Sequence, residues 1–151
     1  MAIVAGVPVP ATQCAIPPGE QNMKFCTAIN CMDGRVQLPV IEYLKRRFKV
    51  EFVDVITEPG PNLILARQGN YSRVESIFER IKISVERHHS AGIAIAGHYD
   101  CAGNPASKKA QTRHIEDAIA RVHGRYSQIE TIGLWVDQNW EVSELAQQND
   151  G

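Results

Sequence analysis

The stretch AGIAIAG, residues 91–97, decides the fold class of this 151-residue chain. It consists only of alanine, glycine and isoleucine, and such a short apolar run is typical of a strand buried on both faces at the centre of a parallel sheet. A sheet of that kind needs helices over both faces, and the segments between consecutive strands supply them. The rest of the chain is therefore expected to alternate between strands and helices.

Three other segments have the composition of strands. MKFCTAIN (23–30) is an apolar run bounded by polar residues, and VEFVDVIT (50–57) is rich in β-branched residues. QIETIGLWVD (128–137) has the same character, and NWEVSEL (139–145) is expected to extend it through a turn.

The segments between these strands predict helices. In QLPVIEYLKRRF (37–48) apolar residues recur every three or four positions, with a proline near the start. Residues 71–89 show the same periodicity, and Asn104-Pro105 resembles a cap followed by a first-turn proline, opening a helix towards Arg121. Residues 58–70, punctuated by proline and glycine, are expected to form a loop. The order of elements predicts an α/β fold with a mostly parallel β-sheet of four to five strands flanked by helices.

Length and composition indicate the domain organisation. With 44% hydrophobic residues, the chain can bury the core of one ordinary domain. Residues 1–22 contain four prolines and are expected to form an extended arm, so that residues 23–151 make up a single α/β domain. The arm lacks a basic region, and no apolar run approaches the roughly 18 residues of a membrane span. We therefore expect no signal peptide, no membrane anchor and a cytoplasmic location.

The charge balance bears on possible partners. Sixteen basic residues stand against 17 acidic ones, for a formal net charge of −1. Such a balance gives no electrostatic reason to bind nucleic acid or an anionic membrane. The basic run Lys45-Arg46-Arg47 falls on a predicted helix and is interpreted as a solvated face. Neither nucleic acid nor membrane is expected as a partner.

Two clusters of reactive side chains follow predicted strands directly. Cys31-Met32-Asp33-Gly34-Arg35 begins where the first strand ends, and Gly97-His98-Tyr99-Asp100-Cys101 begins where the AGIAIAG strand ends. In open α/β sheets, ligands gather beyond the carboxyl ends of the strands, where the strand order reverses. The thiols of Cys31 and Cys101 and the imidazole of His98 can meet there, and these are ligands that zinc prefers. Three protein ligands leave an open position, which distinguishes a catalytic zinc site from a structural one.

The spacing of these residues does not fit other thiol chemistries. A phosphatase-type loop needs arginine where Gln37 stands, a sulfurtransferase-type loop needs it where Val36 stands, and the chain has no Cys-x-x-Cys pair. Cys14, in the arm, and Cys26, within a predicted strand, are interpreted as structural. Asp33 and Arg35 would be a surface ion pair elsewhere. Their position two and four residues after a proposed metal ligand favours a functional role.

The remaining histidines are weaker candidates for function. His88 and His89 end a predicted helix, where a cation is favoured beside the exposed carbonyl groups, and a proton-shuttle role for them stays open. His114 and His123 fall on or after the next helix and are expected to face solvent.

The two clusters resemble the motif of the β-class carbonic anhydrases, Cys-x-Asp-x-Arg followed by His-x-x-Cys. The likeness covers about residues 23–140 and includes residues 66–70 and 132–137. Gly34 stands where most members of that family have serine, and Ala102 where most have glycine. The pocket around the metal is therefore expected to differ from that of the common members.

The resemblance implies a fold, a cofactor and an activity. It implies Zn2+ held by Cys31, His98 and Cys101, with water or Asp33 in the fourth position, and an Asp33–Arg35 dyad. It also implies reversible hydration of carbon dioxide to bicarbonate by a zinc-bound hydroxide, and a homodimer or higher homo-oligomer. Two alternatives stay open: hydrolysis of carbon disulfide or carbonyl sulfide on the same zinc site, or a zinc-binding homologue without turnover.

Overall fold

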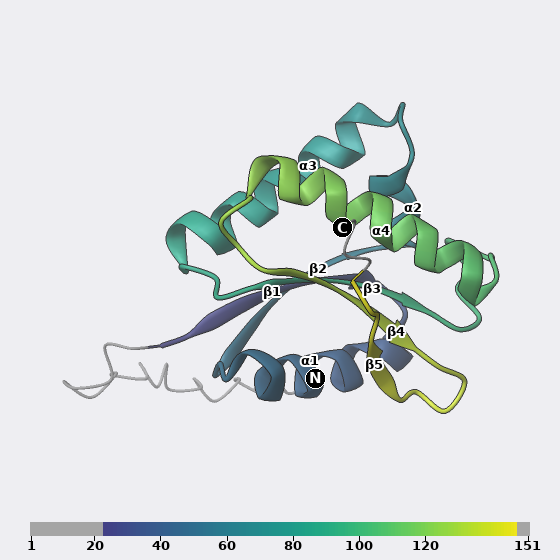
Figure 1. Cartoon of the computed structure of the whole chain (residues 1–151), viewed down its shortest axis with the longest axis horizontal. Coiled ribbons are helices and arrows are strands. Elements are labelled where there is room, and N and C mark those ends of the chain that lie inside the picture. The colour runs from purple at the N-terminus through teal and green to yellow at the C-terminus, as the bar shows by residue number, and fades with distance from the viewer. Residues whose placement is uncertain (1–22, 148–151) are drawn as a thin grey trace, which may run out of the picture.

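The computed structural model describes residues 23–147, which form a five-stranded sheet with helices on both faces (Figure 1). The predicted arm, residues 1–22, lies outside the described residues, as do residues 148–151. The strand order is β2-β1-β3-β4-β5, with the first four strands parallel and β5 antiparallel to β4. The strands are β1 (Phe25–Cys31), β2 (Phe52–Glu58), β3 (Ile93–His98), β4 (Thr131–Val136) and β5 (Val142–Glu144). The predicted α/β fold is confirmed.

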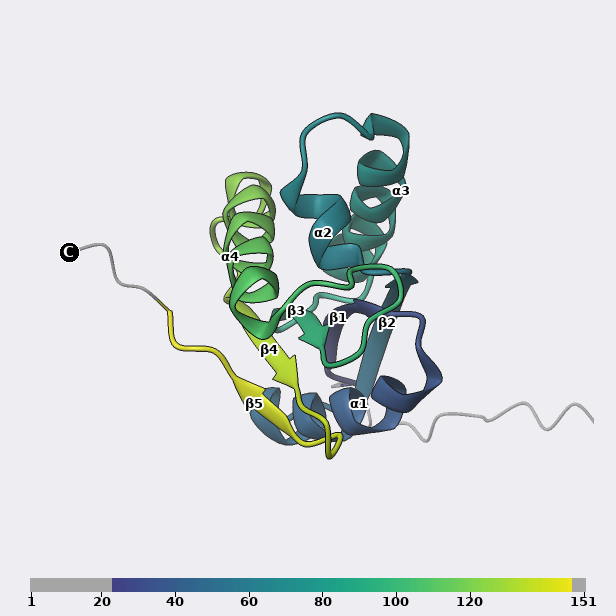
Figure 2. The same ribbon diagram turned by 90° about the vertical axis from the view of Figure 1, so that its right-hand side faces the viewer.

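The helices divide between the two faces of the sheet. Helix α1 (Gly34–Phe48) covers one face, and α2 (Pro61–Ala66), α3 (Tyr71–Lys82) and α4 (Lys108–Arg125) cover the other (Figure 2). Each face has its own apolar core, and β3, which contains most of the AGIAIAG stretch, is buried along its whole length. Burying one isoleucine or leucine side chain contributes about 1.5–3 kcal/mol, so this central strand is a major source of stability.

Three helix boundaries differ from those predicted. Helix α1 starts at Gly34 because the Asp33 carboxylate accepts the Arg35 backbone N–H and caps the helix. Helix α4 starts at Lys108, capped by Ser107, because the predicted cap Asn104 uses its side chain for other hydrogen bonds. It continues to Arg125, four residues past the expected end.

Two segments between strands also differ. Residues 58–70 are not wholly loop, because Pro61 occupies the first turn of the short helix α2, where its missing N–H costs nothing. The helix predicted for residues 71–89 changes at Ile83–Arg87 into one π-helical turn. Within that turn Ser84 is buried, and its hydroxyl donates to Asp54 of β2 at 2.6 Å.

The strand order reverses between β1 and β3. The chain passes from β1 to β2 on one side, then crosses back to β3 on the other side of β1. Cys31 is the last residue of β1 and His98 is the last residue of β3, so both clusters lie at this switch point. This is the position where α/β sheets bind ligands.

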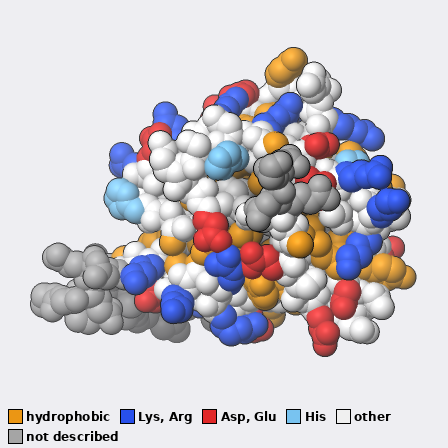
Figure 3. All heavy atoms as spheres, in the orientation of Figure 1, with side chains coloured by type: hydrophobic (Ala, Val, Ile, Leu, Met, Phe, Trp, Pro, Cys, Tyr) orange, Lys and Arg blue, Asp and Glu red, His pale blue; other side chains and the backbone are white. Residues whose placement is uncertain are grey.

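The surface matches the balanced composition. Acidic and basic side chains are interspersed over the face shown in Figure 3. Among residues 23–147, no helix combines the length and apolar character needed to cross a bilayer.

Candidate metal centre

Three potential metal ligands meet at the switch point. One donor atom from each of Cys31, His98 and Cys101 lies within 4.8 Å of the others, and all three residues are buried. The two sulfur atoms are 3.8 Å apart. The fold thus brings together residues separated by 67 and 70 positions in sequence, and the sequence prediction that they meet is confirmed.

The imidazole of His98 is prepared to bind a metal. Its Nδ1 lies 2.7 Å from the Tyr99 carbonyl oxygen, and since a carbonyl can only accept, Nδ1 carries the proton. The lone pair is then on Nε2, which is buried and has no hydrogen-bond partner within the described residues. A buried polar atom without a partner costs free energy, and a metal ion would satisfy it.

The two thiols share one negative charge. The hydrogen bond from Cys101 is the largest of the effects that lower the pKa of Cys31. Together with His98 and the backbone N–H groups of Gly60 and Asp33, it brings this pKa to about 4 against the effect of burial. The same hydrogen bond, together with burial, raises the pKa of Cys101 above the ordinary thiol value. A bound cation would replace the shared proton, because thiolates are the form that binds metal.

Two glycines allow the loops around the sulfurs to touch. Gly60 has φ +61°, and a Cβ there would lie 2.7 Å from the Gly103 carbonyl carbon. A Cβ on Gly103 would lie 2.3 Å from the Pro59 carbonyl carbon. Only glycine permits this backbone contact between the β2–α2 loop and the β3–α4 loop.

Asp33 and Arg35 form the predicted pair. Arg35 Nη2 lies 2.7 Å from Asp33 Oδ2, and Arg35 Nε lies 3.0 Å from Asp33 Oδ1, so the guanidinium holds both carboxylate oxygens. The pair lowers the pKa of Asp33 to about 2, chiefly through the Arg35 side-chain hydrogen bond. Asp33 is therefore ionised throughout the physiological range.

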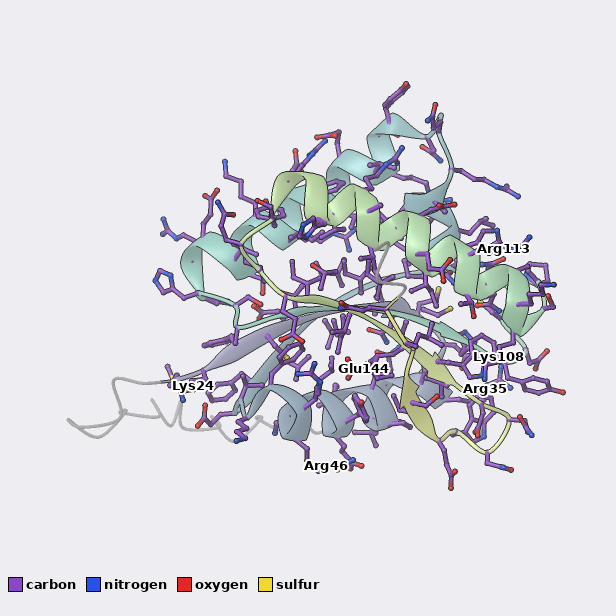
Figure 4. The ribbon with its side chains drawn as sticks, in the orientation of Figure 1. Lys24, Arg35, Arg46, Lys108, Arg113 and Glu144 are labelled. Carbon is purple, nitrogen blue, oxygen red and sulfur yellow. The ribbon has the colours of Figure 1, made fainter. Side chains whose placement is uncertain are left out.

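Arg35 itself is held by two residues that the sequence prediction did not assign. Its Nη1 is 3.3 Å from Asp100 Oδ2, and its guanidinium carbon lies 4.5 Å from the centre of the Trp140 ring. Figure 4 shows Arg35 and Lys108 at the same end of the molecule, beyond the carboxyl ends of the parallel strands. The position of Asp100 between two predicted ligands was a usable signal, whereas Trp140 lies in a hairpin with no recognisable motif.

The other histidines and Cys26 can also be placed. His88 Nδ1 lies 2.7 Å from Asp54 Oδ2, so its main partner is a carboxylate, and His123 is exposed as expected. The prediction that His114 faces solvent was wrong: it is partly buried, and Asn104 donates to its Nδ1 at 3.0 Å. Cys26 is fully buried in β1, in agreement with a structural role.

A parallel α/β sheet with two cysteines and a histidine at its switch point, beside an Asp–Arg pair, is the architecture of the β-class carbonic anhydrases. A family model described as "Putative carbonic anhydrase" matches residues 21–146, and the chain belongs to this family. No curated protein matches it.

Solved structures of β-carbonic anhydrases are similar to this chain. A variant of the β-carbonic anhydrase CafD of the filamentous fungus Aspergillus fumigatus matches 88% of this chain and 95% of its own, at 12% identity and a TM-score of 0.52. A tetrameric β-carbonic anhydrase from the filamentous ascomycete Sordaria macrospora matches 83% of this chain and 82% of its own, at 13% identity and a TM-score of 0.48. At such low identity, the likeness to CafD establishes the fold alone.

Proposed function

We propose that this protein is a zinc enzyme that hydrates carbon dioxide reversibly to bicarbonate, with Cys31, His98 and Cys101 as the zinc ligands. Two observations carry the proposal: Cys31, His98 and Cys101 each offer a donor atom within 4.8 Å of the others, and the buried Nε2 of His98 has no hydrogen-bond partner among the described residues. Two thiolates and one imidazole suit zinc and leave its fourth position open, as in catalytic sites.

The chain's own residues have distinct tasks in this reaction. A zinc ion bound there supplies a water molecule acidified towards neutrality as the nucleophile for carbon dioxide. The ionised Asp33 carboxylate accepts a hydrogen bond and orients that nucleophile. Arg35 keeps Asp33 charged and holds it by two hydrogen bonds, which opposes direct coordination of the metal by the carboxylate.

A cavity beside one of the proposed ligands, Cys101, is large enough for a small substrate. A cavity of about 370 Å³ reaches Cys101 between the β3–α4 loop and β4, and Trp135 and Lys108 also line it. A three-atom linear molecule needs far less room. Carbon dioxide, carbonyl sulfide and carbon disulfide all meet this size limit, so they have to be compared directly.

We also propose a homodimer or larger homo-oligomer in the cytoplasm. Among the described residues, strand β2 forms one edge of the sheet and has two exposed apolar side chains, Phe52 and Val55. An edge strand with exposed apolar side chains favours pairing with another chain. A site that depends on free thiols suits a reducing compartment.

The experiment that tests the function combines metal analysis with hydration kinetics. Purified protein is expected to contain about one zinc per chain and to hydrate carbon dioxide in a stopped-flow pH-indicator assay. His98→Ala should lose both properties, whereas His123→Ala, which changes an exposed histidine of α4, should keep both.

Assays with carbon disulfide and carbonyl sulfide belong in the same experiment. Turnover of these substrates without carbon dioxide hydration would reassign the substrate while keeping the zinc ligands. Bound zinc with no turnover of any of the three would contradict the enzymatic proposal, and full zinc retention by His98→Ala would contradict the ligand assignment.

A further inference from the structure

A buried glutamine behind the metal centre binds the backbone of His98 on both sides of its Cα atom. Gln111, in the first turn of α4, is 1% exposed. Its Oε1 accepts the His98 N–H at 3.2 Å, and its Nε2 donates to the His98 carbonyl at 2.9 Å. One side chain thus satisfies both peptide groups of a proposed zinc ligand.

Strand pairing explains why His98 needs these hydrogen bonds. The β1–β3 ladder ends at the pair Ile29–Ile95, three residues before His98. On the other side, the ladder to β4 continues, and Tyr99 N–H donates to the Val136 carbonyl at 2.9 Å. The amide of Gln111 therefore substitutes for a strand that has already ended, and it keeps the last residue of β3 in place.

Gln111 belongs to a closed ring of three buried amides. Asn62 donates to Gln111 Oε1 at 3.2 Å, and Asn104 donates to Asn62 Oδ1 at 3.3 Å. Gln111 Nε2 closes the ring by donating to the backbone carbonyl oxygen of Asn104 at 3.2 Å. Asn104 lies three residues after Cys101 in the β3–α4 loop. The ring thus connects the segment of His98 to the segment of Cys101.

The residue before His98 provides independent support. A Cβ on Gly97 would lie 2.8 Å from Gln111 Oε1 and 3.0 Å from Asn62 Nδ2. Both distances are shorter than ordinary van der Waals contact, so a side chain at position 97 would push the amides away from His98. The glycine that ends the AGIAIAG stretch makes room for the ring.

We propose that Gln111 is a positioning residue that fixes the backbone of His98 and, through Asn62 and Asn104, its spacing to Cys101 before any metal binds. Gln111 contacts neither metal nor substrate in this role. The inference rests on the proposed function only in assigning His98 and Cys101 as metal ligands. Preorganised ligands bind more tightly because ordering them costs little at the moment of binding.

The test compares Gln111→Met with Thr27→Val. Methionine keeps the length of glutamine and removes every polar contact. Thr27 is also fully buried, and its hydroxyl is hydrogen-bonded to Ser84 and Ser90, outside the amide ring. Thr27→Val therefore measures the general cost of losing a buried polar group. A second variant, Gln111→Glu, keeps the acceptor for His98 N–H but loses the donor, in case the methionine variant does not fold.

Three measurements on each protein distinguish positioning from general stability: zinc affinity against a chromophoric chelator, the absorption bands of the cobalt-substituted protein, and hydrogen exchange of the His98 amide without metal. We expect Gln111→Met to lower zinc affinity about 10- to 100-fold, to change the cobalt bands and to speed His98 exchange. Thr27→Val should leave all three unchanged at a comparable loss of stability.

Equal zinc affinity and equal His98 exchange in the Gln111 and Thr27 variants would overturn the positioning role. None of these measurements uses catalytic turnover. A wild-type protein that binds zinc but does not hydrate carbon dioxide would therefore contradict the proposed function alone.

Discussion

Replacing Arg35 with alanine tests whether this arginine keeps Asp33 away from the metal. In the structure, the guanidinium holds both carboxylate oxygens of Asp33 and is itself held by Asp100 and Trp140. Alanine removes all of these contacts but keeps the backbone N–H that caps α1 through Asp33. A carboxylate freed from its partner beside a dication is expected to coordinate it.

The pKa of Asp33 gives the size of the effect. Its pKa is about 2 against an ordinary 3.8, which corresponds to at most about 2.4 kcal/mol at 1.36 kcal/mol per unit. The Arg35 side chain is 45% exposed, so solvent screening reduces this to about 1 kcal/mol. A free energy of this size corresponds to a factor of about five in the equilibrium between the Asp33 carboxylate paired with Arg35 and the released carboxylate. We therefore expect kcat/KM to fall at least about fivefold, and further if zinc then binds the carboxylate.

The assay is stopped-flow carbon dioxide hydration, together with a crystal structure of the zinc-loaded variant. Arg35→Lys, which keeps the charge without the planar fork, should be intermediate. Arg46→Ala, at an exposed position of the same helix, should behave as wild type. Normal turnover of Arg35→Ala, with water in the fourth metal position, would refute the reasoning.

Three further perturbations follow from the structure. Gly103→Ala should lower the free energy of unfolding by about 1–3 kcal/mol and weaken zinc binding, because its Cβ would overlap Pro59. The control Gly124→Ala, whose Cβ would lie in open space, should cost no stability. Burial, and then the charge of Asp54, raise the pKa of Cys26 to about 12. The stabilisation from the protonated Cys26 thiol is therefore complete below about pH 9. As the pH rises from 9 to 12, the free energy of unfolding should fall by up to about 1.4 kcal/mol per pH unit, and Cys26→Ala should lack this slope. Trp140→Leu should lower hydration activity about two- to fivefold by removing a cation–π contact from Arg35. The expectations for Gly103→Ala and Trp140→Leu fail if these variants match wild type in stability and in hydration activity. The expectation for Cys26 fails if Cys26→Ala shows the same pH dependence of stability as wild type.

The sequence predicted the proposed ligands because their signals are local. Cys31 and His98 each end a mostly apolar strand, and parallel strands bring their carboxyl ends to one edge. Asp33 and Arg35 follow within four residues of Cys31, so their place at that edge is fixed by the same strand. These signals can be recognised in the sequence without knowing how distant loops pack.

The residues that support the proposed ligands were not predictable in this way. Gln111 reaches His98, and Asn62 reaches Gln111, only because α2 and α4 pack side by side over β3, a contact that leaves no periodic signal in sequence. Asn104 and Ser107 are both good helix caps by residue type. Ser107 caps the helix because the Asn104 side chain is hydrogen-bonded to Asn62 and His114. The bond to Asn104 also keeps His114 partly buried.

Removing the metal should leave the fold intact, because the proposed ligands lie at the ends of strands whose cores are complete without them. The buried apolar residues on both faces of the sheet extend well beyond the ligands. Neighbouring strands are held about 4.8 Å apart by their hydrogen bonds. The pairing of β1 with β3 up to Ile29–Ile95 therefore brings the ends of both strands to the same edge of the sheet without an ion. Chelation should therefore preserve the far-ultraviolet circular dichroism spectrum. It should lower the free energy of unfolding only by the lost binding free energy, about 4 kcal/mol where free zinc is 1,000 times its dissociation constant. A structural zinc site behaves differently, since its domain unfolds when the metal is removed. Loss of helical and strand signal on chelation would show that the ion holds the sheet together, which would contradict a preformed centre.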